Sequence, residues 1–113
     1  MDKAPHYRTL IKEIIERFVY PVEEARYQEF ETQVIFDDEG GHYYLLEVGW
    51  EKGRRIHGFT LHIDLKGEKI WIQQDWTEDG AGNLLVERGV PKEDIVLAFH
   101  SPQKRPYTGF AVA

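Results

Sequence analysis

The residues of this sequence best suited to chemistry are the polar side chains between Asp75 and Gly80. Asp75, Thr77 and Asp79 alternate ahead of Gly80, which copies the opening of a calcium-binding EF-hand loop, where oxygen ligands precede a turn glycine. Such a loop needs a bidentate glutamate at its twelfth position, and that position is Val86 here. The sequence therefore favours a structural role, in which Asp75 ends a strand and Thr77 with Asp79 caps a helix.

The same carboxylates indicate a second chemistry, the metal-dependent cleavage of DNA. Clustered carboxylates hold magnesium in many nucleases, and the acidic cluster here would consist of Asp75, Glu78 and Asp79 with His100. Acidic residues also gather at helix starts because they complement the helix dipole. No paired lysine or second carboxylate motif accompanies them. We therefore assign no catalytic residue and keep a small metal-dependent nuclease or hydrolase as an alternative function.

The histidines do not form a metal site by their spacing. His57 and His62 are an odd number of residues apart on one expected strand, so the alternation of a strand places them on opposite faces. His6, His42 and His100 are distant in sequence and could join them only through the fold. Because cysteine is also absent, we expect no metal site and no cofactor.

The formal net charge of −6 argues against tight DNA binding. Non-specific affinity for DNA comes from Lys and Arg side chains that displace counterions from phosphates. Two local clusters have the opposite sign, Arg54 with Arg55 and Lys104 with Arg105. These four residues form a candidate basic patch, and a weak DNA-binding module is a further alternative function.

The chain length of 113 residues fits one domain, residues 1–113. Hydrophobic residues make up 42% of the chain, which excludes a disordered protein. No apolar run approaches the ~20 residues that span a bilayer. The first residues lack the apolar core of a signal peptide, and cysteine is absent. We therefore expect a cytoplasmic protein without membrane contact.

The hydrophobic period changes along the chain and divides it into elements. Apolar residues recur at spacings of three and four from about Pro5 to Val19, which predicts an amphipathic helix that ends at Tyr20-Pro21. From Thr32 to Trp76 the period becomes two, with three turn-forming breaks, which predicts four antiparallel strands. A second helix is expected between Thr77 and Gly89. The predicted fold is α+β, an N-terminal helix packed on a four-stranded antiparallel meander sheet, followed by a second helix and an irregular C-terminal segment.

Two hairpin turns, chosen independently, agree on one buried face of this sheet. A turn at Lys52-Gly53 pairs Tyr44 with Leu61. A turn at Lys66-Gly67 pairs Leu61 with Ile72, so the three side chains share a face. The opposite face then carries a mixture of aromatic, aliphatic and polar residues: Tyr43, Leu45, His62, Trp71 and Gln73. This set is the candidate interaction face, because exposed aromatic side chains anchor many protein interfaces.

The chain ends on small and apolar residues. Phe110 and Val112 alternate with Gly109, Ala111 and Ala113. Free tails are usually polar, so this alternation predicts a short final strand or a docked extension. Its larger side chains would enter a groove in this molecule or in a partner.

Several stretches of the sequence closely resemble the XisI family. They occur in matching order as Arg55-Ile56-His57-Gly58, Ile70-Trp71-Ile72-Gln73-Gln74-Asp75, Thr77-Glu78-Asp79-Gly80, Pro91-Lys92-Glu93-Asp94-Ile95-Val96-Leu97, Phe99-His100-Ser101-Pro102 and Tyr107-Thr108-Gly109-Phe110-Ala111. XisI proteins are named as controlling factors for excision of the fdxN element, a DNA segment removed from the chromosome of filamentous nitrogen-fixing cells. The resemblance implies an accessory factor that contacts an XisH-like companion protein and a site-specific recombinase. A homodimer is a further expectation, and contact with DNA is expected to be indirect or weak.

Overall fold

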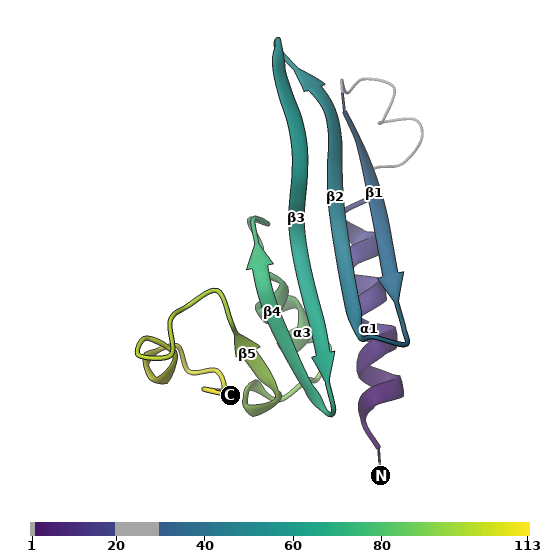
Figure 1. Ribbon diagram of the computed structural model, residues 1–113. Helices are drawn as coiled ribbons and strands as arrows, with labels where there is room; N and C mark the ends of the chain where they lie inside the picture. The colour runs from purple at the N-terminus through teal and green to yellow at the C-terminus, as the bar shows by residue number, and fades with distance from the viewer. Residues whose placement is uncertain (1, 20–29) are drawn as a thin grey trace.

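The computed structural model describes residues 2–19 and 30–113, which form a five-stranded sheet with helices on one of its faces (Figure 1). The strands stand in chain order across the sheet: β1 (Phe30–Asp37), β2 (His42–Glu51), β3 (Arg54–Lys66), β4 (Lys69–Asp75) and β5 (Ile95–Leu97). The helices are α1 (Ala4–Arg17) and α3 (Ala81–Glu87), with short 3₁₀ helices at Lys92–Asp94 and Arg105–Tyr107. The first four strands are antiparallel neighbours, as the sequence predicts, whereas β5 runs parallel to β4. The α+β class is confirmed, and the expected four-stranded sheet is corrected to a five-stranded mixed sheet.

Helix α1 buries the apolar stripe that the sequence predicts. The buried side chains follow the helical spacing: Tyr7, Leu10, Ile11, Ile14 and Ile15. Pro5 lies in the first turn, where its missing N–H removes no helical hydrogen bond. Tyr20 and Pro21, at which the sequence predicts the end of the helix, lie outside the described residues.

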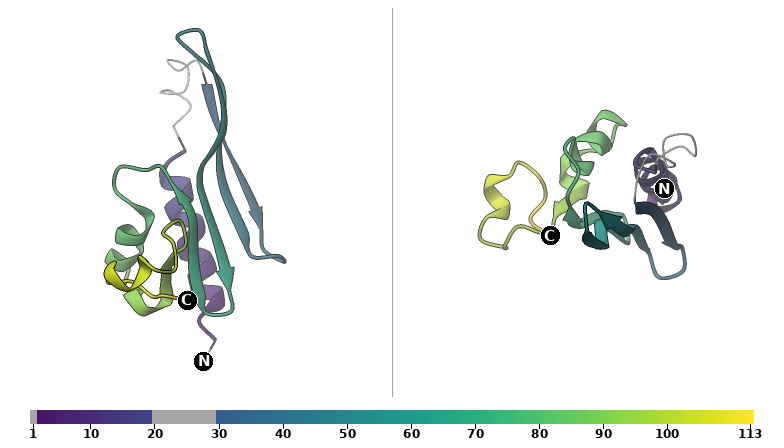
Figure 2. Two further views of the ribbon diagram at one scale, coloured as in Figure 1. Left: turned by 60° about the vertical axis from the view of Figure 1, so that its left-hand side comes forward. Right: turned by 90° about the horizontal axis from the view of Figure 1, so that it is seen from above.

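The sheet has an inner face, which packs against α1 and α3, and an outer face on the opposite side. The inner face carries apolar residues of the core: Tyr43, Leu45, Leu61, Ile63, Ile70 and Ile72. The outer face carries a mixture of aromatic, apolar and polar residues: His42, Tyr44, Leu46, Phe59, His62, Asp64, Trp71 and Gln73. Figure 2 shows both helices on the same side of the sheet.

One extra residue in β3 decides which side chains of β2 enter the core. The pairing set by the predicted turn at the tip of the β2–β3 hairpin holds as far as Leu46 and Phe59. The next pair is Leu45 with Leu61, which leaves Thr60 as a β-bulge. Because side chains alternate between faces, this slip of one residue exchanges the inner and outer sets of β2 relative to β3.

The turn between β3 and β4 lies one residue later than the sequence predicts. Lys66 pairs with Lys69, so the turn residues are Gly67 and Glu68. Asp64 therefore faces Trp71 instead of Lys69, two positions further along β4. This shift of two positions leaves side chains on their predicted faces as far as the pair of Ile63 with Ile72. Beyond that pair Gln73 forms a second bulge, and His62 lies opposite Gln74.

The start of helix α3 is held by Asp75 at the end of β4. Its Oδ2 accepts a hydrogen bond from the backbone N–H of Ala81 at 2.7 Å, and its Oδ1 accepts one from the N–H of Thr77 at 2.9 Å. The hydroxyl of Thr77 accepts from the N–H of Gly80 at 3.2 Å. These contacts fix the connection from the sheet to α3.

No described helix is long and apolar enough to cross a membrane.

Strands β2 and β3 extend beyond β4 as a projecting hairpin (Figure 1). The pairing of β3 with β4 ends at Leu61 and Asp75, whereas β3 continues beside β2 to Arg54 at the tip. We call residues 46–59 the arm. Strand β1 lies along its β2 side, where Phe30 pairs with Gly49. The arm is therefore three strands wide as far as Gly49, where the pairing with β1 ends.

The chain ends beside β5, as a docked extension. Ala111 forms a parallel bridge with Val96, and its N–H donates to the carbonyl of Ile95 at 2.9 Å. Phe110 is half-buried and packs against the hydrophobic core, whereas Val112 is exposed. The predicted docking of the C-terminus therefore takes place within this molecule, through Phe110.

Candidate interaction face and histidine cluster

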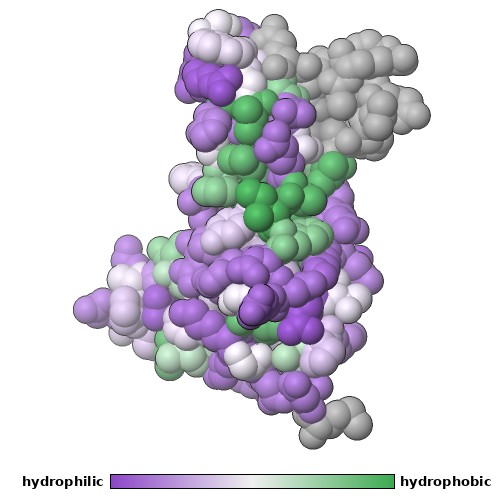
Figure 3. All heavy atoms as spheres, turned by 45° about the vertical axis from the view of Figure 1, so that its right-hand side comes forward, coloured by the Kyte–Doolittle hydropathy of each residue, from purple (hydrophilic) through white to green (hydrophobic). Residues whose placement is uncertain are grey.

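A patch of apolar and aromatic side chains crosses the outer face where the arm meets the rest of the sheet. Strand pairing places Ile35 beside Tyr44 and Leu46 beside Phe59. The ring centroids of Tyr44 and Phe59 lie 4.9 Å apart, while Ile35 is 45% exposed and Phe59 is 43% exposed. We call these four residues the arm patch. Figure 3 shows apolar side chains gathered in the upper half of this view of the surface.

Next to the arm patch, the carboxylate of Asp64 is hydrogen-bonded by two histidines. Its Oδ1 lies 2.8 Å from Nδ1 of His42 and 2.8 Å from Nε2 of His62. Nε2 of Gln73 donates to Oδ2 at 3.2 Å. Burial raises the pKa of Asp64, but the hydrogen bonds from His42 and His62 outweigh burial and hold this pKa below its ordinary value. The ring of Tyr44 stacks on His62 with centroids 4.3 Å apart, so the arm patch and the histidine cluster are in contact.

Two residues of the predicted interaction face lie in the core instead. Tyr43 is fully buried, and Leu45 is 1% exposed. The bulge at Thr60 is the physical reason, because it turns both side chains toward the helices. The assignment of these two residues to an accessible face is wrong. Their neighbours Tyr44 and Leu46 lie on the outer face in their place.

The other three predicted residues, His62, Trp71 and Gln73, lie on the outer face. Trp71 is contacted there by cations of its own chain. Nζ of Lys66 lies 4.5 Å from the centroid of the indole ring, and Cζ of Arg105 lies 5.6 Å from it. The C-terminal segment therefore covers part of Trp71, and the arm patch is the more accessible aromatic surface.

The sequence does not reveal that His42 and Asp64 join His62. It also places His57 and His62 on opposite faces, whereas the bulge at Thr60 places both on the outer face. The available signal was an aspartate inside the apolar run of β3 with a histidine two residues before it. The sequence signal does not include His42, which the strand register places opposite Asp64.

The predicted basic patch is divided between two parts of the molecule. Arg54 and Arg55 lie at the tip of the arm, whereas Lys104 and Arg105 lie in the C-terminal segment near β5 (Figure 1). Nε of Arg105 donates to the backbone carbonyl of His100 at 3.0 Å. Arg105 therefore helps to shape its own segment, and the four cations do not form one surface.

The predicted acidic cluster makes structural contacts. Asp75 caps α3, as described above, and Oδ2 of Asp79 lies 3.8 Å from Nη2 of Arg17. Glu78 is exposed. Among the described residues, no hydrogen bond or ion pair joins His100 to these carboxylates. Asp75 therefore contacts the start of α3, whereas Asp79 pairs with α1 instead of capping α3 as the sequence predicts.

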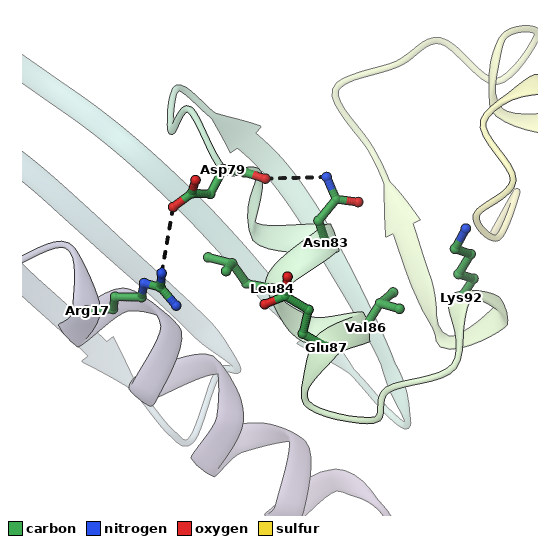
Figure 4. A pocket seen from close by; sticks show the side chains of 7 residues that line it. All are labelled: Arg17, Asp79, Asn83, Leu84, Val86, Glu87 and Lys92. Atoms are coloured by element: carbon green, nitrogen blue, oxygen red, sulfur yellow. Dashed lines mark hydrogen bonds and ion pairs between the residues drawn. The ribbon is translucent and has the colours of Figure 1, made fainter.

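A shallow pocket of about 520 Å³ lies between the end of α1 and helix α3 (Figure 4). Arg17 and Asp79 pair across it, and Nδ2 of Asn83 donates to the carbonyl of Asp79 at 3.3 Å. Glu87 and Lys92 add one charge of each sign to the lining. The pocket therefore shows no preference for an anionic or a cationic ligand.

Comparisons of sequence and of structure agree on one family. The XisI protein family matches residues 1–112. The fold is similar to the crystal structure of a XisI-like protein from Anabaena variabilis ATCC 29413, with 38% sequence identity, a TM-score of 0.84, and coverage of 98% of this chain and 100% of that chain. It is also similar to the crystal structure of the fdxN element excision controlling factor XisI from Anabaena variabilis ATCC 29413, with 32% sequence identity and a TM-score of 0.79. That similarity covers 99% of this chain and 100% of that chain. A search of curated proteins finds no match. On the family match and these two whole-chain similarities, the chain belongs to the XisI protein family.

Proposed function

We propose that this protein is an accessory factor in the excision of a DNA element and that it acts by binding other proteins. The process is supported by the name of one similar structure, an fdxN element excision controlling factor. The mode of action rests on one observation, the arm patch of Ile35, Tyr44, Leu46 and Phe59 on the outer face of the sheet.

The arm patch has the character of a contact surface because its apolar side chains are neighbours. Single exposed apolar residues are common on proteins, but contiguous ones mark interaction sites. In residues 2–19 and 30–113, both α-helices lie on the inner face, so neither covers the patch (Figure 2). Removing the exposed parts of Ile35 and Phe59 from water in a complex would contribute roughly 1 kcal/mol each.

The direct partner in this proposal is an XisH-like companion protein, and the two together act with a site-specific recombinase. The net charge of −6 supports protein contact over DNA contact. A protein that binds the DNA element needs a basic surface. An acidic accessory factor complements such a surface and is repelled by the DNA itself.

Co-expression of the protein with an XisH-like protein from the same genome, followed by affinity capture, tests this function. We expect a stoichiometric complex that Phe59→Glu and Leu46→Glu each weaken at least tenfold, because both place a charge in the apolar contact. Tyr107→Glu is the matched control, since Tyr107 is 90% exposed in the C-terminal segment. Circular dichroism of each variant confirms that the fold is retained. Capture that is unchanged by both patch variants would contradict a role for the arm patch.

A further inference from the structure

Three side chains of the kinds that bind metal ions meet on the outer face of β2 and β3. His42 and Asp64 are cross-strand partners, and His62 lies two residues before Asp64 on the same face. One ring nitrogen of each histidine and a carboxylate oxygen of Asp64 all lie within 4.8 Å of one another. Strand pairing and alternation therefore bring two imidazoles and one carboxylate to a single point.

We propose that His42, His62 and Asp64 bind a divalent transition-metal ion of the Zn²⁺ class. Two imidazole nitrogens and a carboxylate oxygen are ordinary ligands of Zn²⁺, and three protein ligands leave a fourth position for water or for another donor. Calcium and magnesium prefer oxygen ligands, so the two imidazoles select against them. This site is independent of the proposed role in excision.

To hold the ion, the three ligand atoms, which lie within 4.8 Å of one another, would have to be about 3.3 Å apart. Bonds of about 2.0–2.1 Å in a tetrahedral site separate the ligand atoms by about 3.3 Å. Oδ1 of Asp64 lies 2.8 Å from each histidine nitrogen, so both rings would move outward by about half an ångström. The side chain of His42 is 45% exposed, which gives this ring room to move and gives the ion a path from solvent.

Neighbouring side chains already orient two of the three ligands. Nε2 of Gln73 donates to Oδ2 of Asp64 at 3.2 Å, which leaves Oδ1 directed at the histidines. The ring of Tyr44 stacks on His62 at an interplanar angle of 29°. Outer contacts of this kind fix ligand orientation in metal sites and strengthen binding.

A bound ion would join His42, the first residue of β2, to the C-terminal part of β3. The site forms only when the two strands are paired, so an ion that binds it stabilises the folded chain over the unfolded one. The expected signature is therefore a rise in the unfolding temperature as well as binding of the metal.

Titration of the full-length, chelator-treated protein with ZnCl₂ tests the proposal by calorimetry and thermal unfolding. We expect one ion per chain and a higher unfolding temperature. Co²⁺ in place of Zn²⁺ should give the visible absorption of a four-coordinate ion. His42→Gln and His62→Gln should each weaken binding at least tenfold. His57→Gln is the matched control, because His57 is exposed on the same face and lies outside the cluster.

Two outcomes would overturn the metal site. The first is that Zn²⁺ produces no binding heat and no change in the unfolding temperature of the wild-type protein. The second is that both cluster variants bind as tightly as wild type, or that His57→Gln weakens binding as much as they do. Because the wild-type titration needs no substitution, it decides whether the ion binds even if a variant does not fold.

Discussion

The hydroxyl of Tyr7 in α1 donates a hydrogen bond to Oδ2 of Asp94, 87 positions further along the chain. Nζ of Lys3 lies 3.1 Å from the same oxygen. Tyr7 is 4% exposed and Asp94 is 9% exposed, so the contact is largely shielded from water. It ties the first helix to the turn that precedes β5.

We expect Tyr7→Phe to lower the free energy of unfolding by about 1–3 kcal/mol, because it leaves a buried carboxylate without its main donor. Urea denaturation measures the change. Tyr107→Phe is the matched control, since Tyr107 is 90% exposed and should change stability by less than about 0.5 kcal/mol. Equal effects of the two substitutions would contradict a stabilising role for the Tyr7–Asp94 contact.

The same contact predicts how stability depends on pH. The hydrogen bond from Tyr7 lowers the pKa of Asp94, burial opposes it, and the hydrogen bond from Lys3 lowers the pKa further, so the pKa in the folded state lies below its usual value. The stabilisation is therefore complete above the unfolded-state pKa of about 3.9 and is lost as pH falls through the folded-state pKa. The difference in unfolding free energy between wild type and Asp94→Asn should shrink below about pH 4. A difference that stays constant from neutral to acid pH would contradict this assignment.

Two turn glycines with similar backbone angles should differ in their tolerance of alanine. Gly41 has φ +75° and Gly53 has φ +77°, so alanine costs about 1–2 kcal/mol of backbone strain at either position. A Cβ at Gly41 would also lie 2.5 Å from the carbonyl oxygen of Leu65, whereas a Cβ at Gly53 meets nothing within 4 Å. We expect Gly41→Ala to destabilise the protein clearly more than Gly53→Ala in urea denaturation. Similar losses of unfolding free energy in the two variants would contradict a steric clash between the new Cβ and the carbonyl oxygen of Leu65.

The docked C-terminus should contribute to the stability of the isolated protein. We expect Phe110→Ala to lower the free energy of unfolding by about 1–3 kcal/mol, less than a fully buried phenylalanine because Phe110 is only half-buried. Val112→Ala is the control and should have little effect, since Val112 is 52% exposed. Removal of residues 109 to 113 should likewise lower the unfolding temperature. An unchanged unfolding temperature with loss of partner binding would instead identify a recognition tail.

We expect the protein alone neither to cut DNA nor to bind it tightly. The overall charge is −6, and the candidate cations are divided between the arm tip and the C-terminal segment. An electrophoretic mobility assay with duplex DNA at ~150 mM salt, with and without magnesium, checks both properties. Sub-micromolar retardation that the double variant Arg54→Glu, Arg55→Glu abolishes would support the alternative of a DNA-binding module.

The sequence predicts the elements whose patterns are long. The stripe of α1 extends over several turns, and glycine marks the breaks between the first four strands. Strand β5 was missed because Ile95–Leu97 is three residues long, too short to show a period. Strand β5 is a parallel neighbour of β4, and parallel neighbours need a crossover connection. Helix α3 lies in that connection, so the position of β5 depends on how α3 packs.

The faces of β2 could not be predicted because both alternating sets of its side chains are apolar or aromatic. Tyr43 and Leu45 make as good a core as Tyr44 and Leu46, so hydrophobicity does not choose between them. The choice is made by the bulge at Thr60, which matches the β2 side chains to the inward residues of β3. The candidate sites depend on the same choice, because it brings Tyr44 onto Phe59 and His62.

Among residues 2–19 and 30–113, the part of β3 in the arm has one neighbouring strand, β2. Between Arg54 and Gly58 this strand pairs with β2, and no other strand of the described residues lies on its far side. The edge begins beside Phe59, whose carbonyl accepts a hydrogen bond from Nε2 of Gln74. Such an edge is a template for strand addition by another chain. Charges at Arg54 and Arg55, together with the bulge at Thr60, are the features that natural sheets use to discourage indiscriminate edge-to-edge pairing. The side chains along this edge therefore limit the pairing of β3 with a strand of another chain.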